Sequence, residues 1–267
     1  MIRESRGCRD LERVAELVRE RGLAIGAPLT IRDVTGSTND DAKRAAKEGA
    51  PSGAVFLAEE QTAGRGRMGR TWVSPRGENL LFSVLVRPSC PPSRVPPLAL
   101  VAGLAVRDAV ARALGDESRP KVKWPNDVHV DGKKIAGVLV ESIVAGSRVE
   151  AVIVGIGLNV HTRELPPELA PIATSISLAG APRPPDRGAI LADVLAGLDR
   201  DLGHVAARGL GLVHARLSAA DALRGKRVSG EAGAGIAEGI DPDGRLLVRG
   251  DDGVLHRWVS GEVTQAP

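Results

Sequence analysis

Hydrophobic residues recur along the chain at two spacings, and these spacings predict where helices and strands lie. Leucine and valine three or four positions apart predict amphipathic helices at residues 10–21 and 97–114. Runs rich in β-branched and aliphatic residues predict strands. The expected strands are residues 30–34, 54–60, 79–87, 121–130, 134–142 and 149–160, and the further helices are about ten residues ending at Gly49, 187–206 and 210–223.

The order of these elements predicts two domains after a short helical leader. Asp131–Gly132 lies between two expected strands and is a strong hairpin signal, so the main sheet should be antiparallel or mixed. From residue 227 to 263, short apolar strands alternate with Gly- and Asp-rich turns, as in a small all-β barrel. We therefore expect an α+β fold with a leader at 1–28, a main domain at 29–222 and a β-barrel domain at 223–267.

Composition indicates a globular protein with no membrane or nucleic-acid signal. Hydrophobic residues make up 43% of the 267 residues, yet no apolar run is long enough to span a bilayer. The N-terminus leads into a charged amphipathic run rather than an apolar signal core, so we expect a cytoplasmic protein. The net charge of +3 is modest, and the 2% of aromatic residues offer few platforms on which bases could stack. We expect no nucleic-acid partner and no membrane.

The two cysteines stand in unrelated contexts. Neither Cys8 nor Cys90 has a second cysteine or a histidine at metal-ligand spacing. We expect two inert thiols and no metal site built from side chains.

A glycine-punctuated loop at Gly64–Arg70 carries three arginines. Glycine lets the backbone come close to a ligand, and each guanidinium offers a fork of donors that matches phosphate or carboxylate oxygens. The loop also fits G-x-G-x-x-G, but Thr71–Pro75 is β-branched and then broken by proline, so the helix that a dinucleotide fold needs cannot begin there. The loop is therefore predicted to clamp an oxyanion.

A lysine at the end of an expected strand is the second candidate. Lys123 stands between valine and tryptophan, and Pro125 then interrupts the strand and leaves Asn126 and Asp127 at the sheet edge. A fixed ammonium beside a nucleotide would stabilise charge that develops on an α-phosphate. Its plainer reading is a surface cation whose aliphatic stem is buried.

Five motifs stand in one order along the chain. They are G-S-T-N at 36–39, Q-T-A-G-R-G-R-M-G-R at 61–70, K-W-P-N-D-V at 123–128, I-A-G-V-L-V-E at 135–141 and G-I-G-L-N-V at 155–160. In this order the sequence resembles the biotin protein ligases. The resemblance runs from about residue 30 to the C-terminus, where Trp258–Val263 is similar to the close of that family's small barrel.

The resemblance implies both a fold and a reaction. The fold would be a catalytic domain like that of class II aminoacyl-tRNA synthetases, followed by an SH3-like barrel. The reaction would join biotin to ATP as biotinoyl-5′-AMP, release pyrophosphate, and pass the acyl group to a lysine of the biotin carboxyl carrier protein of acetyl-CoA carboxylase. ATP with Mg²⁺ would be the co-substrate. Whether the protein is a monomer or a homodimer stays open.

The resemblance also implies a role for each matching residue. Lys123 and Arg67 would be the catalytic cations and would also meet biotin. The other biotin-binding residues would be Ser37, Thr38, Asn39, Gln61, Gly64, Arg65, Gly66 and Gly137. ATP would be bound by Arg67, Arg70, Trp72, Asn126 and Asn159, with Trp72 packed on adenine. The division suits the substrates, since hydroxyls and amides pair with a neutral ureido ring while cations pair with carboxylate and phosphate.

Structural explanations compete with several of these roles. Ser37–Asn39 could be only a helix cap, Trp72 could be core, and Gly155–Asn159 could be a β-bulge and turn.

Three other functions compete with the ligase. A bifunctional ligase and biotin-operon repressor would need a winged helix-turn-helix of about three helices, whereas one helix is expected before residue 30. A lipoate or octanoate ligase is the closer enzymatic alternative, and K-W-P-N-D with the arginine loop speaks against it. A biotin-binding module without activity would not need Lys123 and three loop arginines.

Overall fold

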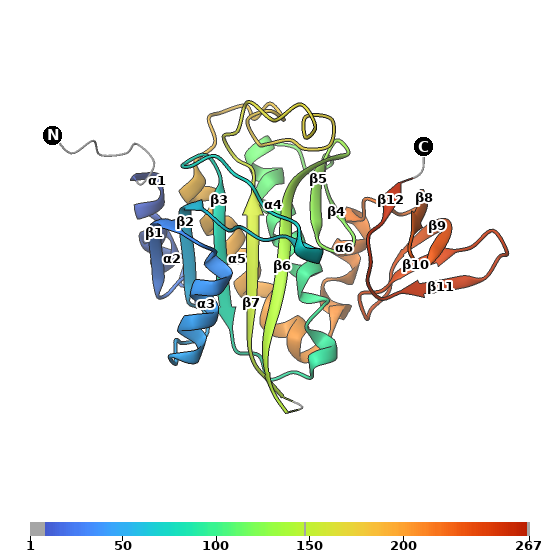
Figure 1. Ribbon diagram of the computed structural model, residues 1–267, viewed down its shortest axis with the longest axis horizontal. Helices are drawn as coiled ribbons and strands as arrows, with labels where there is room; N and C mark the ends of the chain where they lie inside the picture. The colour runs from blue at the N-terminus through green and yellow to red at the C-terminus, as the bar shows by residue number, and fades with distance from the viewer. Residues whose placement is uncertain (1–8, 147, 266–267) are drawn as a thin grey trace.

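The computed structural model describes residues 9–146 and 148–265, so Cys8 and the first residues of the expected leader lie outside the described part. Figure 1 shows two parts: a large sheet with helices, and a smaller sheet formed by the C-terminal residues. The expected α+β class is confirmed.

The large sheet has seven strands, and its order differs from the order of the chain. β1 and β2 run parallel, and the other neighbouring pairs are antiparallel, so the predicted mixed sheet is confirmed. From one edge to the other the strands are β1 (Leu29–Thr35), β2 (Val55–Gln61), β3 (Leu80–Val86), β7 (Arg148–Leu158), β6 (Lys133–Ala145), β5 (Asp127–Val130) and β4 (Pro120–Lys123).

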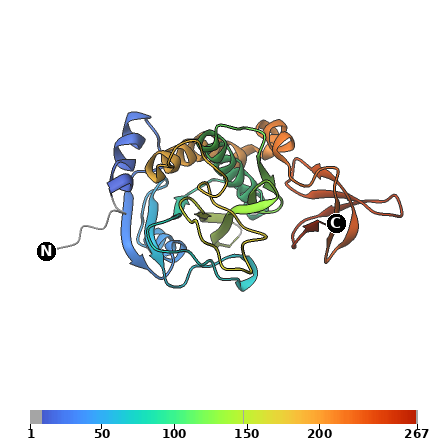
Figure 2. The ribbon, with the colours of Figure 1, turned by 90° about the horizontal axis from the view of Figure 1, so that it is seen from above.

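Helices cover the two faces of this sheet unequally. α4 (Leu98–Leu114) and α5 (Arg187–Arg208) pack together on one face, and α3 (Thr38–Lys47) lies on the other, as Figure 2 shows from above. α4 and α5 approach closely at Gly197, where an added Cβ would lie only 2.8 Å from the Cβ of Ala105. The shorter elements are α1 (Arg9–Glu12), α2 (Val14–Glu20), α6 (His214–Ala220), and the 3-10 turns η1 (Arg67–Gly69), η2 (Pro92–Arg94) and η3 (Leu210–Leu212).

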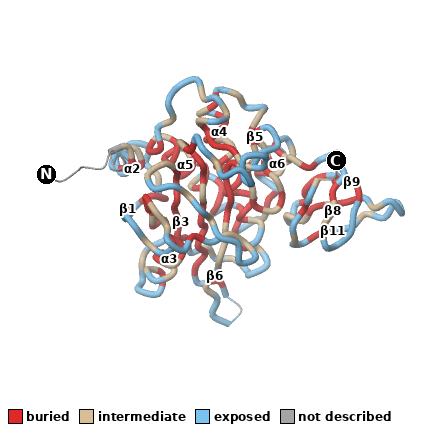
Figure 3. The backbone as a smooth tube through the Cα atoms, turned by 45° about the horizontal axis from the view of Figure 1, so that its top comes forward, coloured by how far each residue is buried: buried red, intermediate tan, exposed pale blue. Residues whose placement is uncertain are grey.

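The core lies between the sheet and the α4–α5 layer, where Figure 3 shows the buried backbone gathered. Almost every α4 residue that faces inward is aliphatic, and Leu98 and Leu104 are fully enclosed. A smaller cluster, which includes Ala42, Leu85 and Ile153, packs α3 against the opposite face. The face under α3 is thus only partly covered, and its open portion is available to a ligand.

Two sequence predictions differ from the structure. Residues 121–130 form two strands, because Pro125 has no amide donor for a ladder and the chain turns back so that Lys123 pairs with Asp127. Residues 10–21 likewise form two short helices, α1 and α2. The hairpin at Asp131–Gly132 is confirmed, with positive φ angles of 51° and 81°.

The C-terminal part is a five-stranded antiparallel sheet. Its strands follow the order β11 (Leu255–Trp258), β10 (Leu246–Arg249), β9 (Gly233–Ile240), β8 (Arg227–Gly230) and β12 (Thr264–Gln265). β11 and β12 lie at opposite edges of this sheet. A pairing between them would close the expected barrel, and none is found among residues 9–146 and 148–265. The indole nitrogen of Trp124 donates to the carbonyl of Gly244 at 2.9 Å and joins this sheet to the main domain.

Across the described residues, no helix combines the length and the apolar character that crossing a bilayer requires.

Candidate functional site

A cavity opens on the face of the main sheet beside α3, beneath the arginine loop. Its walls come from the first turn of α3, the end of β2, the loop, the middle of β6 and the C-terminal part of β7. The lining residues are Ser37, Thr38, Asn39, Gln61, Arg65, Gly66, Arg67, Arg70, Thr71, Trp72, Asn126, Lys134, Gly137, Val138, Leu139, Gly155, Ile156 and Gly157. The structure therefore brings most of the predicted site residues to one place.

Buried polar groups of α3 and β2 form one end of the cavity. Ser37 occupies the N-cap position of α3 but makes no capping hydrogen bond through its side chain. The side-chain oxygen of Gln61 accepts from the backbone N–H of Thr38 at 2.8 Å and from its hydroxyl at 3.1 Å. Ser37, Thr38 and Asn39 are each less than 5% exposed. This end offers neutral donors and acceptors in fixed positions, which suits a neutral polar ligand.

Asn39 is held by a row of residues across three strands. Ser83 pairs with Gly155, and Gly155 pairs with Leu139. The buried hydroxyl of Ser83 donates to Oδ1 of Asn39 at 2.6 Å. A Cβ on Gly155 would lie 2.1 Å from the same oxygen, so only glycine leaves room for the amide. The row thus fixes the orientation of Asn39.

Arg65 is pinned to α3 rather than left open to a ligand. Its guanidinium makes two hydrogen bonds to Asp40, both at 2.7 Å, and lies 3.5 Å from Glu141. The same guanidinium holds the pKa of the Asp40 carboxyl below its usual range. Burial alone would raise the pKa of Glu141, but hydrogen bonds from Lys43 and Asn39 hold that pKa below its usual value. The network fastens the first half of the arginine loop over the cavity.

The second half of the loop turns sharply and directs the guanidinium groups of Arg67 and Arg70 away from α3. Met68 and Gly69 have positive φ angles of 55° and 73°, so the chain reverses and the N–H of Gly66 donates to the carbonyl of Arg70 at 2.7 Å. Arg67 donates to the side-chain oxygen of Asn126 at 3.2 Å. Burial lowers the pKa of the Arg67 guanidinium, which still carries its charge at neutral pH.

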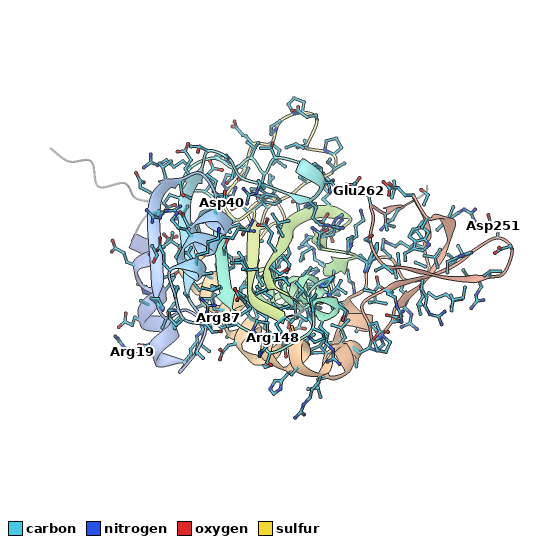
Figure 4. All side chains as sticks on the ribbon, turned by 60° about the horizontal axis from the view of Figure 1, so that its bottom comes forward. Arg19, Asp40, Arg87, Arg148, Asp251 and Glu262 are labelled. Atoms are coloured by element: carbon cyan, nitrogen blue, oxygen red, sulfur yellow. The ribbon has the colours of Figure 1, made fainter. Side chains whose placement is uncertain are left out.

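Arg70 connects the loop to the C-terminal domain. Its guanidinium lies 2.5 Å from the carboxylate of Glu262. Figure 4 shows Asp40 on the α3 side of the loop and Glu262 at the edge of the C-terminal domain that faces the main sheet. The loop is therefore held at both ends by carboxylates from different parts of the chain.

Lys123 is the last residue of β4 and lies beside this loop. It is not among the residues that line the cavity. Burial lowers the pKa of its ammonium group, and the charges of Asp127, Lys134, Glu262 and Arg70 also act on it. Asp127, Arg70 and Glu262 act on Arg67 as well. Lys123 and Arg67 thus share one electrostatic environment.

The indole of Trp72 lies on bare backbone at the other end of the cavity. Gly137 and Gly157 pair across β6 and β7, and a Cβ on Gly157 would lie 2.5–2.8 Å from atoms of the Trp72 ring. The ammonium of Lys134 is 5.6 Å from the ring centroid. The indole N–H is buried and has no hydrogen-bond partner within the described part of the chain.

Two other predicted residues lie away from the cavity. The side chain of Asn159 donates to the carbonyl of Thr174 at 3.0 Å and is buried, so in this conformation it fastens the 163–185 connection to the sheet. The carbonyl of Gly64 accepts a hydrogen bond from the backbone N–H of Trp72 at 2.9 Å, and a Cβ added at Gly64 would lie 2.5 Å from the Trp72 carbonyl oxygen. Gly64 thus holds Trp72, which lines the cavity, whereas Asn159 holds a segment outside it.

Sequence reasoning did not identify Ser83, Asp40, Glu141 and Lys134 as parts of the site. Ser83 is the lone hydroxyl in the apolar run of β3, and Glu141 closes the I-A-G-V-L-V-E motif, so each carried a weak signal. Among residues 9–146 and 148–265 there is no cluster of three or more His, Cys, Asp or Glu side chains that could hold a metal ion.

The arrangement joins two chemistries in one cavity. Hydroxyl and amide groups surround one end, while Arg67, Arg70 and Lys134 bring positive charge to the other. Such a cavity suits a ligand with a neutral polar head and an anionic tail.

Comparison with protein families matches both parts of the chain. Residues 32–159 match the biotin/lipoate A/B protein ligase family. Residues 225–264 match the biotin protein ligase C-terminal domain.

Individual proteins are similar over nearly the whole chain. A bifunctional ligase/repressor BirA from Bacillus subtilis is 34% identical over 86% of this chain and 72% of its own length. A biotin–acetyl-CoA-carboxylase ligase from Mycobacterium tuberculosis is 37% identical over 90% of this chain and 92% of its own. A solved biotin protein ligase from Aquifex aeolicus, in complex with biotin and ATP, superposes with a TM-score of 0.74 at 29% identity and covers 90% of this chain and 99% of its own.

Proposed function

Because the chain belongs to the biotin protein ligase family, we propose that it activates biotin with ATP as biotinoyl-5′-AMP and transfers the acyl group to a lysine of a biotin carboxyl carrier domain. The carrier would be that of acetyl-CoA carboxylase, the substrate in the name of the mycobacterial relative. Residues 29–222 would form the catalytic unit and 223–267 the accessory domain, acting together in the cytoplasm.

One observation carries the proposal: the neutral end and the cationic end belong to a single cavity. Biotin has a neutral ureido ring at one end and a carboxylate at the other. The ring would lie among Ser37, Thr38, Asn39 and Gln61, whose hydrogen-bonding groups are fixed in advance. The carboxylate would then point toward Arg67 and Lys123, where the nucleotide must also bind.

Each remaining residue has a proposed part in this placement. Gly66 and Gly137 would let the ligand approach the backbone, and Arg65, held by Asp40, would keep the loop closed over biotin. Arg70 and Asn126 would bind the phosphates. Trp72 would pack on adenine. Gly64 and Asn159 would support the site from outside it, since neither borders the cavity in the described structure.

The chemistry needs no covalent intermediate with the protein. An oxygen of the biotin carboxylate attacks the α-phosphorus of ATP, a new oxygen–phosphorus bond forms, and pyrophosphate leaves with the electron pair of the broken bond between the α-phosphorus and the bridging oxygen. The neutral amine of the acceptor lysine then attacks the acyl carbon, a carbon–nitrogen bond forms, AMP leaves with the electron pair of the broken carbon–oxygen bond, and the amine proton passes to solvent. Fixed cations stabilise the charge that develops on phosphate oxygens, and positioning supplies much of the remaining acceleration. Mg²⁺ would accompany ATP as a counter-ion of its phosphates.

The proposal is tested with purified protein, ATP and a carrier domain. Biotin should drive pyrophosphate release, and biotin should appear on a single carrier lysine. Lipoate, offered at the same concentration, should give neither signal. Preferential incorporation of lipoate would make the substrate assignment wrong, and biotin binding without pyrophosphate release would make the protein a binding module.

A further inference from the structure

A second lysine ammonium lies at the cationic end of the cavity. The Nζ of Lys134 is 2.8 Å from Oδ1 of Asp127, and the two side chains are 31% and 21% exposed. The same ammonium lies over the indole of Trp72. A cation in contact with both a carboxylate and an aromatic face is held in one place although it is partly removed from water.

The backbone around Lys134 is fastened on both sides. Its N–H donates to the carbonyl of Ile172, and its carbonyl accepts from the N–H of Thr174, each at 2.8 Å. From this anchor the side chain passes over Gly137, where an added Cβ would lie 3.2 Å from Nζ. The missing side chain at Gly137 thus opens the path by which Lys134 reaches the cavity.

Lys134 and Lys123 stand in different positions relative to the cavity. Lys134 borders the cavity, whereas Lys123 does not belong to the described lining. The charges of Asp127 and Lys134 both act on the Lys123 ammonium. Asp127 is therefore shared by two ammonium groups, and Glu262 and Arg70 are the other charges that act on Lys123.

We infer that Lys134 is a second catalytic cation of the proposed reaction, whose ammonium contacts the α-phosphate of ATP while the biotin carboxylate attacks it. The inference rests on the proposed function. The bond between the carboxylate oxygen and the α-phosphorus forms as the bond from that phosphorus to pyrophosphate breaks, and no proton moves in this step. Negative charge gathers on the non-bridging oxygens of the α-phosphate, and a fixed ammonium stabilises that charge. Asp127 keeps the ammonium in place until the phosphate arrives.

The neighbouring lysine provides a matched control. Lys133 is exposed, and its ammonium donates to the carbonyl of Ala170 in the 163–185 connection, away from the cavity. Lys133→Met and Lys134→Met therefore remove the same charge from adjacent positions. Lys134→Arg restores a cation at the proposed place.

The test measures adenylate formation in a single turnover, together with biotin affinity by calorimetry without ATP. Lys134→Met should slow adenylate formation by about 100-fold, the scale for losing one fixed group that stabilises transition-state charge. Its biotin affinity should equal that of the parent. Lys133→Met should match the parent in both measurements, and Lys134→Arg should recover most of the lost rate.

Two results would overturn the inference. One is adenylate formation at the parental rate in Lys134→Met. The other is an equal loss of rate in Lys134→Met and Lys134→Arg with weakened biotin binding in both, which would mean that Lys134 only supports the fold of the site. If the parent protein itself released no pyrophosphate from biotin and ATP, the proposed function would fail, and this outcome is distinct from either.

Discussion

The guanidinium of Arg67 donates a hydrogen bond to the side-chain oxygen of Asn126 at 3.2 Å. Arg67 belongs to the loop after β2, and Asn126 to the turn between β4 and β5, at the far side of the sheet. Asn126 is in turn fixed by its amide, which donates to the carbonyl of Val138 at 2.8 Å. The bond therefore joins two cationic segments that are distant in sequence around one cavity.

Replacing Arg67 with alanine should leave the fold intact and let the adenylate escape. Arg67 belongs to a surface loop, so the core loses no packing, while a charged hydrogen bond to phosphate is worth about 1.5–3 kcal/mol. Adenylate dissociation should accelerate by roughly 10–150-fold, which a chase with unlabelled biotin measures. Arg76→Ala is the control, because Arg76 pairs with Asp33 outside the cavity. Equal dissociation from the Arg67 variant and the parent would contradict the assignment.

Replacing Lys123 with alanine should mainly slow adenylate formation. Its ammonium would no longer stabilise the carboxylate and phosphate as they react, whereas the hydrogen bonds to the ureido ring of biotin come from groups at the other end of the cavity. Single-turnover kinetics should give a rate lowered by about 100-fold, with a much smaller loss of biotin affinity. Formation of adenylate at the parental rate would remove Lys123 from the mechanism.

The rate should also depend on pH through Lys123. Burial lowers the pKa of its ammonium group, with Asp127, Glu262, Lys134 and Arg70 as the neighbouring charges, so the group loses its proton at a lower pH than a free lysine near 10.4. Adenylate formation should therefore fall as pH rises through this lowered pKa. Lys123→Arg keeps its charge, so its alkaline decline should begin at higher pH. The same alkaline decline in both proteins would assign it to another group.

Two glycines of β7 should affect the two substrates separately. A Cβ at Gly155 would collide with Asn39, and a Cβ at Gly157 would collide with Trp72. Gly155→Ala should therefore weaken biotin binding by about tenfold or more, the scale for misplacing one buried hydrogen-bonding group. Gly157→Ala should instead raise the KM for ATP. Gly203→Ala is the control, since a Cβ there meets nothing within 4 Å.

If both variants lost biotin affinity equally, the division of the cavity into two ends would be wrong.

Ser83→Ala should weaken biotin binding through Asn39. The change removes the donor to Oδ1 of Asn39 and leaves that buried oxygen without this partner, at a cost of about 1–3 kcal/mol in the free energy of unfolding. Urea denaturation and biotin titration measure the two effects. Ser93→Ala, at an exposed position, should change neither. A variant with full biotin affinity would mean that Asn39 is held without Ser83.

Local pattern was sufficient to predict most of the helices and strands. The strand predicted at 79–87 lies at Leu80–Val86, because an apolar run interrupted only by Ser83 and buried on both faces needs no distant information. The reversal between β4 and β5 was missed for the opposite reason. Val122, Trp124, Val128 and Val130 are buried at even positions on both sides of the turn, so the alternation continues through it and hides the change of direction.

The site was predictable only where its residues form motifs in the sequence. Arg67, Lys123 and Thr38 could be chosen because the surrounding residues resemble a known pattern. Ser83 and Lys134 could not be chosen, since their importance comes from strand pairing that places them under α3 and beside Trp72. No local property distinguishes Lys134 from Lys133 until the sheet assigns one to the cavity and the other to the surface.

A crystal structure with a stable analogue of biotinoyl-5′-AMP tests the central claim most directly. The account predicts that Lys123 and Arg67 both lie within hydrogen-bonding distance, about 3 Å, of oxygens at the carboxyl–phosphate junction, with the ureido ring against Asn39 and Thr38. Lys123 and Arg67 pointing into separate cavities with the ligand in place would contradict it.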